Sequence, residues 1–293
     1  MNTTKKIGFA CKWIDYPSQV DGIKPKDNAK EYNTRSTTVR WLNNQTKEVA
    51  EQRLWDLMVH NIESSRKLVE RIGGLDEHLR MVRLSSDILP VYTQHEWSYF
   101  WRRSDVVAYA ERAFGEVGEL ARSRGVRLSF HPGQFTVLAS ANPGIVDRSI
   151  EEFEYHTDMI RWMGYGKTFQ DFKCNVHISG KLGPRGIMMA LRRLSPEARN
   201  ALTIENDEMT WGLDASLELI KDCALVLDIH HHYIKTGEYI EPTDDRFKGV
   251  VDSWRGVRPV IHYSYSRDEW LPEGFDHSEL PNLNLLLESG HKK

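Results

Sequence analysis

Short hydrophobic runs recur along the chain, and several of them end in a histidine or an acidic residue. The residues that end five of these runs are His131, His177, Glu205, Asp228 and His262. Helix-like stretches separate the runs, the longest over residues 47–72 with apolar side chains at helical spacing. An alternation of strands and helices predicts a (β/α)₈ (TIM) barrel, an α/β fold in which the carboxyl ends of the strands share one face. We therefore expect imidazoles and carboxylates from five strands to meet around one point.

Seven strands are recognisable, so we expect the last βα unit to be missing or truncated. The expected strands lie near residues 7–11, 79–84, 126–130, 174–176, 202–204, 225–227 and 259–261. Nothing after Ser266 reads as a closing strand, which would leave a gap between the first and seventh strands. We expect the segment 283–287, a loop or a partner subunit to cover those edges. No internal repeat or linker is found, which predicts a single domain over residues 1–293.

Composition and charge restrict the possible functions only in part. The chain has 293 residues, 40% of them hydrophobic, and three cysteines without CxxC spacing, which indicates free thiols in a reducing compartment. It shows neither a signal-peptide core nor an apolar run of membrane-spanning length. We expect a cytoplasmic monomer with no membrane partner. The net charge of −3 does not exclude DNA, because bound divalent ions would add positive charge where a phosphate has to lie.

The polar residues that end the strands are candidate metal ligands. Glu205 is a carboxylate that could bridge two cations, and Asp228 and His231 could bind one metal ion or two neighbouring ones. Asp207 and Glu208 are expected to lie in a solvated loop. A ligand set of nitrogen and oxygen without cysteine suits Zn²⁺, Mn²⁺ or Fe²⁺. A pair of such ions would suit hydrolysis of a phosphodiester.

The segment His131-Pro132-Gly133-Gln134-Phe135 is the most distinctive in the chain. Gly133 would allow a tight turn that directs His131 inward and raises Gln134 and Phe135 over the mouth of the barrel. An exposed aromatic ring beside an amide suits stacking on a nucleobase and hydrogen bonding to it. The alternative is a capped turn in which Phe135 joins a minor apolar cluster.

With these segments the chain resembles the ultraviolet damage endonucleases. The resemblance covers nearly the whole chain and runs through residues 7–11, 83–86, 131–135, 205–207, 228–231 and 262–264. It implies a barrel similar to that of endonuclease IV, and nicking of damaged double-stranded DNA on the 5′ side of ultraviolet photoproducts. It also implies two or three divalent metal ions, with Mn²⁺ expected and Zn²⁺ or Mg²⁺ as alternatives.

Residue by residue, the resemblance implies that Gln134 and Phe135 probe the duplex and that Glu205 and His231 are catalytic. The implied metal ligands are His95, His131, His177, Glu205, Asp228, His231 and His262. Val260 stands where some family members have a lysine associated with the metal centre. Only His277 and Glu288 are near substitutes for the family's last two ligands. Two alternatives therefore stay open: a sugar isomerase or epimerase on the same barrel, and a lesion-binding protein that does not cleave.

Overall fold

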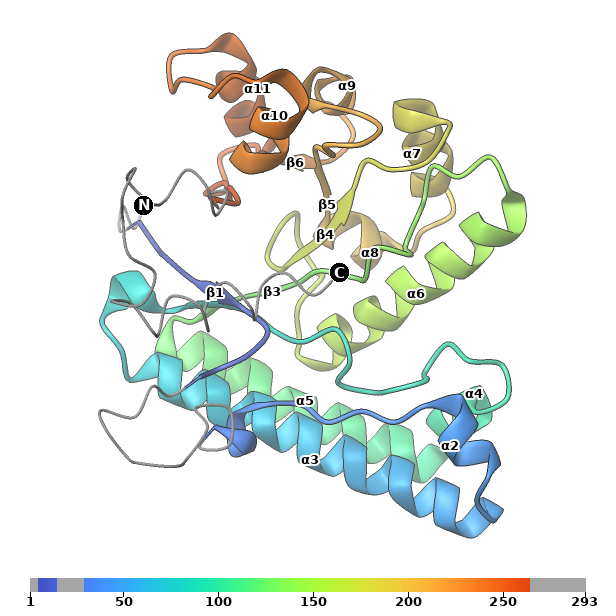
Figure 1. Cartoon of the computed structure of the whole chain (residues 1–293). Helices are drawn as coiled ribbons and strands as arrows, with labels where there is room; N and C mark the ends of the chain where they lie inside the picture. Colours follow the sequence, from blue (N-terminus) through green and yellow to red (C-terminus); the bar gives the residue numbers. More distant parts are fainter. Residues whose placement is uncertain (1–4, 15–28, 264–293) are drawn as a thin grey trace, which may run out of the picture.

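Six parallel strands form the sheet of this protein, and their spatial order follows the chain. The computed structural model describes residues 5–14 and 29–263. The strands are β1 (Phe9–Ala10), β2 (Met81–Arg83), β3 (Arg127–Phe130), β4 (Lys173–His177), β5 (Leu202–Glu205) and β6 (Ala224–Val226). They follow an arc with the helices on its outer side (Figure 1). Consecutive parallel strands joined by helices are the arrangement that the alternating sequence pattern predicts.

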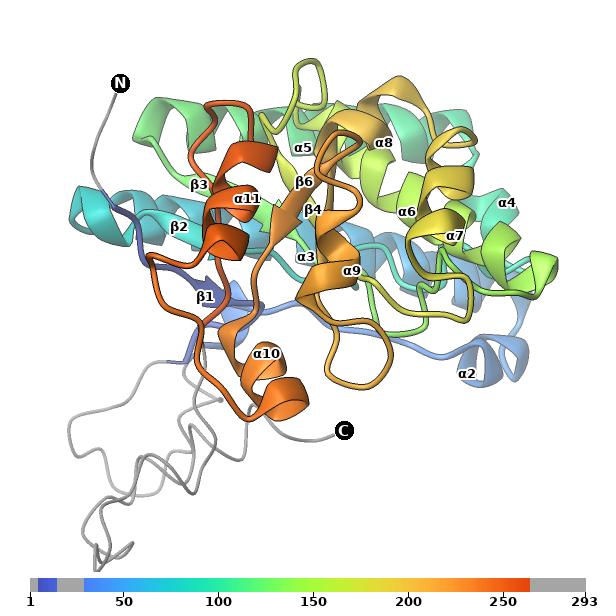
Figure 2. The ribbon, with the colours of Figure 1, turned by 90° about the horizontal axis from the view of Figure 1, so that it is seen from above.

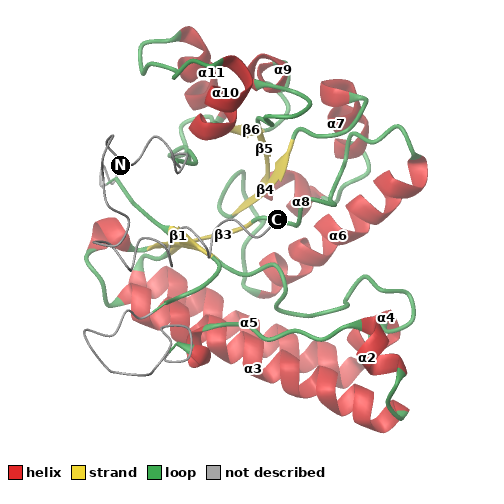
Figure 3. Ribbon diagram, in the orientation of Figure 1, coloured by secondary structure: helices red, strands yellow, loops and turns green. Residues whose placement is uncertain are grey.

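Helices are the main secondary structure of the described chain and surround the short central strands (Figure 3). They are α2 (Val39–Asn43), α3 (Lys47–Gly73), α4 (Ser98–Trp101), α5 (Ser104–Arg124), α6 (Pro143–Trp162), α7 (Gly183–Leu191), α8 (Pro196–Ala201), α9 (Leu213–Leu217), α10 (Ile229–Thr236) and α11 (Asp245–Ser253), with 3₁₀ turns η1 (Lys30–Tyr32) and η2 (Glu77–Leu79). The long predicted helix is confirmed as α3, which begins where the Thr46 hydroxyl accepts a hydrogen bond from the Val49 N–H. No helix in the described part of the chain is long and apolar enough to cross a membrane.

The two faces of the strands have different chemistry, because side chains alternate along a strand. In β4, Cys174 and Val176 belong to the main apolar core together with residues of α3, α5 and α6. The alternate residues Lys173, Asn175 and His177 form the other face. Helices α3 and α5 pack side by side across the sheet's outer layer (Figure 1 and Figure 2). The outer face is therefore held by apolar packing, which leaves polar side chains on the inner face.

A second, smaller apolar cluster lies on the side of the barrel that β6 and the seventh expected strand form. It contains Ala224, Val226, Trp254 and Val260, with Met81 packed against it. The Trp254 indole N–H donates to the Leu225 carbonyl oxygen at 2.7 Å. Apolar side chains thus anchor the end of the described chain to β6.

The seventh expected strand is reduced to one residue pair in the described chain. His262 forms a single parallel bridge with Asp228, through hydrogen bonds between backbone groups of residues 227, 229 and 262. β1 is also shorter than the predicted run over residues 7–11, since Cys11 has a positive φ of 68° and leaves the strand conformation. The predictions for residues 264–293, including His277, Glu288, the segment 283–287 and the missing closing unit, lie outside the described residues.

Candidate metal centre

Histidines from four parts of the chain meet at the carboxyl end of the sheet. His131 directly follows β3, His177 ends β4, His231 lies in the first turn of α10, and His262 follows α11. The ring centre of His177 lies 5.0 Å from that of His131 and 5.2 Å from that of His231. The ring centres of His131 and His262 are 6.0 Å apart. The structure therefore brings together residues that the sequence separates by more than a hundred positions.

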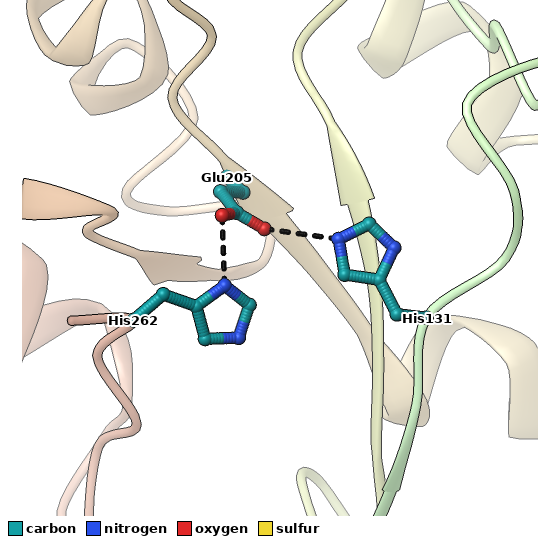
Figure 4. Close-up of side chains that lie close together, drawn as sticks. All are labelled: His131, Glu205 and His262. Carbon is teal, nitrogen blue, oxygen red and sulfur yellow. Dashed lines mark hydrogen bonds and ion pairs between the residues drawn. The ribbon is translucent and has the colours of Figure 1, made fainter. Parts of the chain in front are cut away.

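Glu205, the last residue of β5, lies at the centre of these rings with a relative exposure of 1%. Its Oε2 is 3.2 Å from Nε2 of His131, and its Oε1 is 2.7 Å from Nδ1 of His262 (Figure 4). The side-chain amide of Asn175 also donates to Oε2. Two imidazoles and one side-chain amide thus orient this carboxylate.

Glu205 is shared by two groups of side chains that could each hold a metal ion. One consists of His131, Glu205 and His262, and the other of His177, Glu205 and His231. Within each group the possible ligand atoms all lie within 4.8 Å of one another. Two adjacent nitrogen and oxygen sites that share one carboxylate have the form of a two-cation centre.

The protonation states of the cluster suit metal binding. Burial opposes ionisation of Glu205, but His262 and His131 hold the pKa of this carboxyl well below its usual range. Burial lowers the pKa of His177, and burial with the nearby Lys173 lowers that of His262 to about 4. Glu205 is therefore charged and both imidazoles are neutral near pH 7, which are the forms that bind a metal ion.

Asp228 and His231 are positioned by the start of α10. Asp228 is 7% exposed, and its Oδ1 accepts the backbone N–H of His231 at 2.9 Å as the helix cap. Burial raises the pKa of Asp228 to about 6. Nδ1 of His231 lies 3.0 Å from the carbonyl oxygen of Asn206 and can donate to it, which leaves the lone pair on Nε2. The capping contact and this hydrogen bond together fix the orientation of the imidazole.

The expectation that Asp207 and Glu208 lie in a solvated loop is wrong. Oδ2 of Asp207 is 3.9 Å from Nδ1 of His177, and Oε2 of Glu208 is 3.4 Å from Nε2 of His231. Their side chains are only 13% and 16% exposed. The loop folds back because the Asp207 N–H donates to the carbonyl oxygen of Trp211, which directs both acids toward the histidines.

Two further polar residues of β4 were not predicted. Nζ of Lys173 lies 2.8 Å from Nε2 of His262 beneath the cluster, and burial lowers the pKa of Lys173 to about 7. Asn175 accepts from the Thr203 hydroxyl at 2.7 Å while its amide donates to Glu205. The signal that could have found them is the two-residue spacing of Lys173, Asn175 and His177 in an otherwise apolar strand.

The remaining predicted site residues lie at the rim or away from the cluster. Gln134 and Phe135 are exposed in a turn closed by the Thr136 N–H and the Gly133 carbonyl oxygen, with Phe135 85% exposed. Gly133 has no positive φ, so this turn does not depend on the freedom of glycine. His95 is exposed and belongs to neither of the two groups that the described residues form.

The fold and the cluster define a class of protein, an α/β barrel with a candidate multi-metal centre at the carboxyl ends of its strands. The chain belongs to the UV-endonuclease UvdE family, whose model matches residues 7–278. This confirms the resemblance found in the sequence.

Several named proteins are similar to this chain. The UV-damage endonuclease of Schizosaccharomyces pombe is 28% identical over 261 residues, which cover 81% of this chain and 42% of that protein. The UV DNA damage endonuclease of Bacillus pumilus is 28% identical over 208 residues, covering 67% of this chain and 61% of the relative. That of Bacillus cereus strain B4264 is 24% identical over 250 residues, covering 82% and 74%. The chain thus spans less than two thirds of the length of the first two relatives.

A solved structure supports the assignment of the fold. The crystal structure of SacUVDE matches with a TM-score of 0.71 at 19% identity, over 96% of this chain and 89% of that one. At this identity the likeness concerns the fold alone. It confirms the predicted α/β fold of the TIM-barrel type.

Proposed function

We propose that this protein is a metal-dependent DNA repair endonuclease that nicks double-stranded DNA on the 5′ side of ultraviolet photoproducts. The observation that carries the proposal is the buried Glu205 carboxylate shared by two histidine groups. Membership of the UvdE family and relatives named as endonucleases support it. The reaction would be hydrolysis of a phosphodiester bond in the damaged strand.

The residues that would hold two or three divalent ions are those of the two groups, with Asp228 beside them. Their donor atoms are nitrogen and oxygen, which suits Mn²⁺, the expected metal, and also Zn²⁺, whereas Mg²⁺ prefers oxygen ligands. When bound, such ions lower the pKa of a coordinated water and neutralise charge that develops on phosphate oxygens. Asn175 would keep Glu205 in orientation through its amide contact.

His231 is proposed to move a proton at the rim of the site. Its Nε2 lies 3.4 Å from Oε2 of Glu208, and its side chain is 19% exposed, so solvent or substrate can reach it. Asp228 raises the pKa of His231 against the effect of burial, which lowers it. Because Nδ1 faces the Asn206 carbonyl oxygen, only Nε2 is available, and it can either bind an ion or carry a proton. Where Nε2 binds no ion, a pKa above the ordinary value for histidine lets the imidazole take up a proton near neutral pH and pass it to a leaving oxygen.

Recognition of the lesion is assigned to Gln134 and Phe135. They project from the turn directly after His131, so a base that stacks on Phe135 brings its phosphate near the cluster. Stacking tolerates any base, which suits recognition of distortion more than of sequence.

The test is a nicking assay on a duplex with one defined photoproduct, labelled at either 5′ end. Metal-loaded protein should give a single cut on the 5′ side of the lesion, chelation should abolish the cut, and Mn²⁺ should restore it. Absence of nicking by folded, metal-loaded protein would contradict the proposal. Turnover of a sugar phosphate in a parallel reaction would favour the isomerase alternative.

A further inference from the structure

A second exposed apolar side chain, Met209, lies beside the candidate metal centre. Met209 is 79% exposed, and Phe135 at 85% is the only large hydrophobic residue in the described chain with a higher exposure. Both lie in loops that follow strand ends, Phe135 after β3 and Met209 after β5. β4, with His177 at its end, runs between these two strands. Both loops therefore lie at the carboxyl end of the sheet, on either side of β4, which is the end where the candidate metal ligands gather.

The backbone that carries Met209 is held firmly. Oδ1 of Asp207 accepts the N–H groups of Met209 at 2.6 Å and of Thr210 at 2.8 Å. The Asp207 N–H donates to the Trp211 carbonyl oxygen at 2.9 Å, which closes the loop. Met209 is thus the tip of a closed turn and not part of a loose segment.

Contacts to neighbouring elements fix this turn relative to the strands. The Trp211 indole N–H donates to the Gly180 carbonyl oxygen at 2.7 Å, and the Thr210 hydroxyl donates to the Ile178 carbonyl oxygen at 3.4 Å. Gly180 and Ile178 both lie in the segment after β4. Nζ of Lys235 in α10 donates to the Thr210 carbonyl oxygen at 3.2 Å. Because these contacts already hold the backbone of the turn, the backbone loses little conformational freedom when the turn binds a partner.

The position of the turn connects Met209 to the reaction centre. The two residues that precede it, Asp207 and Glu208, face His177 and His231 at 3.9 Å and 3.4 Å. Met209 therefore directly follows two acidic residues that face the candidate metal ligands. A duplex whose phosphate lies on the cluster would have its bases within reach of this turn.

We propose, building on the proposed function, that Met209 is a specificity-determining wedge that enters a distorted base step from the side of β5. Proteins that unstack DNA insert apolar side chains, methionine among them, between neighbouring bases. The energetic cost of insertion is least where a lesion has already weakened stacking, so the wedge favours damaged over intact duplex. Phe135 and Met209 then contact the distorted step from two loops.

The experiment compares Met209→Ala and Met209→Leu with the wild-type protein. The control is Met189→Ala, which removes another exposed methionine, 52% exposed in α7. The probe is a duplex with a photoproduct beside 2-aminopurine, whose fluorescence rises when that base is unstacked. Equilibrium binding of damaged and intact duplex, metal content and nicking rates are measured on the same preparations.

Met209→Ala should lose most of the fluorescence rise and about tenfold in preference for damaged duplex, with metal content unchanged. Met209→Leu and Met189→Ala should behave as wild type. Full unstacking and unchanged preference in Met209→Ala would overturn the inference, as would a wild-type protein that nicks without unstacking. Unstacking by a wild-type protein that does not nick would refute the proposed reaction and leave the wedge standing.

Discussion

Replacing Glu205 by glutamine tests the centre most directly, because the change removes one charge and almost no volume. The carboxylate is 1% exposed and lies in both candidate metal groups. Two unit charges about 4 Å apart interact with about 4 kcal/mol at an effective dielectric constant of about 20. A divalent ion next to Glu205 would feel at least this attraction. Since 1.4 kcal/mol corresponds to about tenfold in affinity, Glu205→Gln should weaken metal binding by about a thousandfold or more.

The fold should survive the substitution, because His177 and His262 are neutral and need no counter-charge. Burial lowers the pKa of the nearby Lys173 to about 7, so this amine can lose its proton when the charge of Glu205 is removed. We expect a normal circular dichroism spectrum, loss of bound metal by inductively coupled plasma mass spectrometry, and no nicking of irradiated plasmid. The matched control is Glu197→Gln in α8, which removes a carboxylate that is 37% exposed and 3.4 Å from Arg161. An ion pair this exposed contributes at most about 1 kcal/mol, so the control should keep its metal and its activity.

Retention of wild-type metal content by a folded Glu205→Gln protein would refute the assignment of Glu205 as a metal ligand. Retention of metal with complete loss of nicking would place Glu205 in the chemistry but outside the coordination of the ions. Loss of folding in the variant but not in the control would show that the carboxylate is needed for stability before any metal binds.

Three further predictions concern recognition, pH and metal removal. Gln134→Ala combined with Phe135→Ala should lower the preference for irradiated over intact plasmid about tenfold or more, since stacking on an aromatic contributes about 1–3 kcal/mol per base; lost metal with unchanged preference would make this turn structural. Burial lowers the pKa of His156 to about 4, and its Nε2 has no hydrogen-bond partner among the described residues. As the pH falls, His156 is therefore protonated in the unfolded chain before it is protonated in the folded protein. The stability that this residue contributes above about pH 6.5 is lost as the pH falls toward 4. His156→Gln should remove about 2 kcal/mol of the decrease in unfolding free energy between pH 7 and pH 5, measured by urea titration, and an unchanged pH dependence would contradict this. Chelation should lower the melting temperature by about 4 °C, because metal at a hundred times its dissociation constant stabilises by about 2.7 kcal/mol; identical melting curves with and without Mn²⁺ would speak against a metal site.

Two features of the fold could be predicted, because both depend on patterns within short segments of the sequence. They are the order of the strands and the clustering of His131, His177, Glu205 and His262. A hydrophobic run marks each strand, its last residue marks the carboxyl end, and parallel topology brings those ends together. The long helix α3 has a strong apolar period and was predicted to within a residue at each end.

What the sequence did not reveal depends on contacts between distant residues. The inward direction of Asp207 and Glu208 follows from a loop closed by Trp211, which no local pattern encodes. The amine of Lys173 lies against His262, 89 positions later in the chain, and no local pattern around Lys173 indicates this contact. The length of β1 was overestimated, since the positive φ of Cys11 is not visible in its residue type.

The weak backbone attachment of His262 has a consequence for how metal binding would affect the stability of the sheet. Its backbone is joined to the sheet by one bridge to Asp228, while its side chain lies between Glu205 and Lys173. A cation bound by His131, Glu205 and His262 would link the third strand to the end of the described chain, much as a covalent cross-link does. Amide hydrogen exchange around residues 227–229 and 262 would then slow when metal is loaded, more than exchange at β3 or β4. A metal ion at this candidate centre would in this way also stabilise the attachment of residue 262 to the edge strand β6.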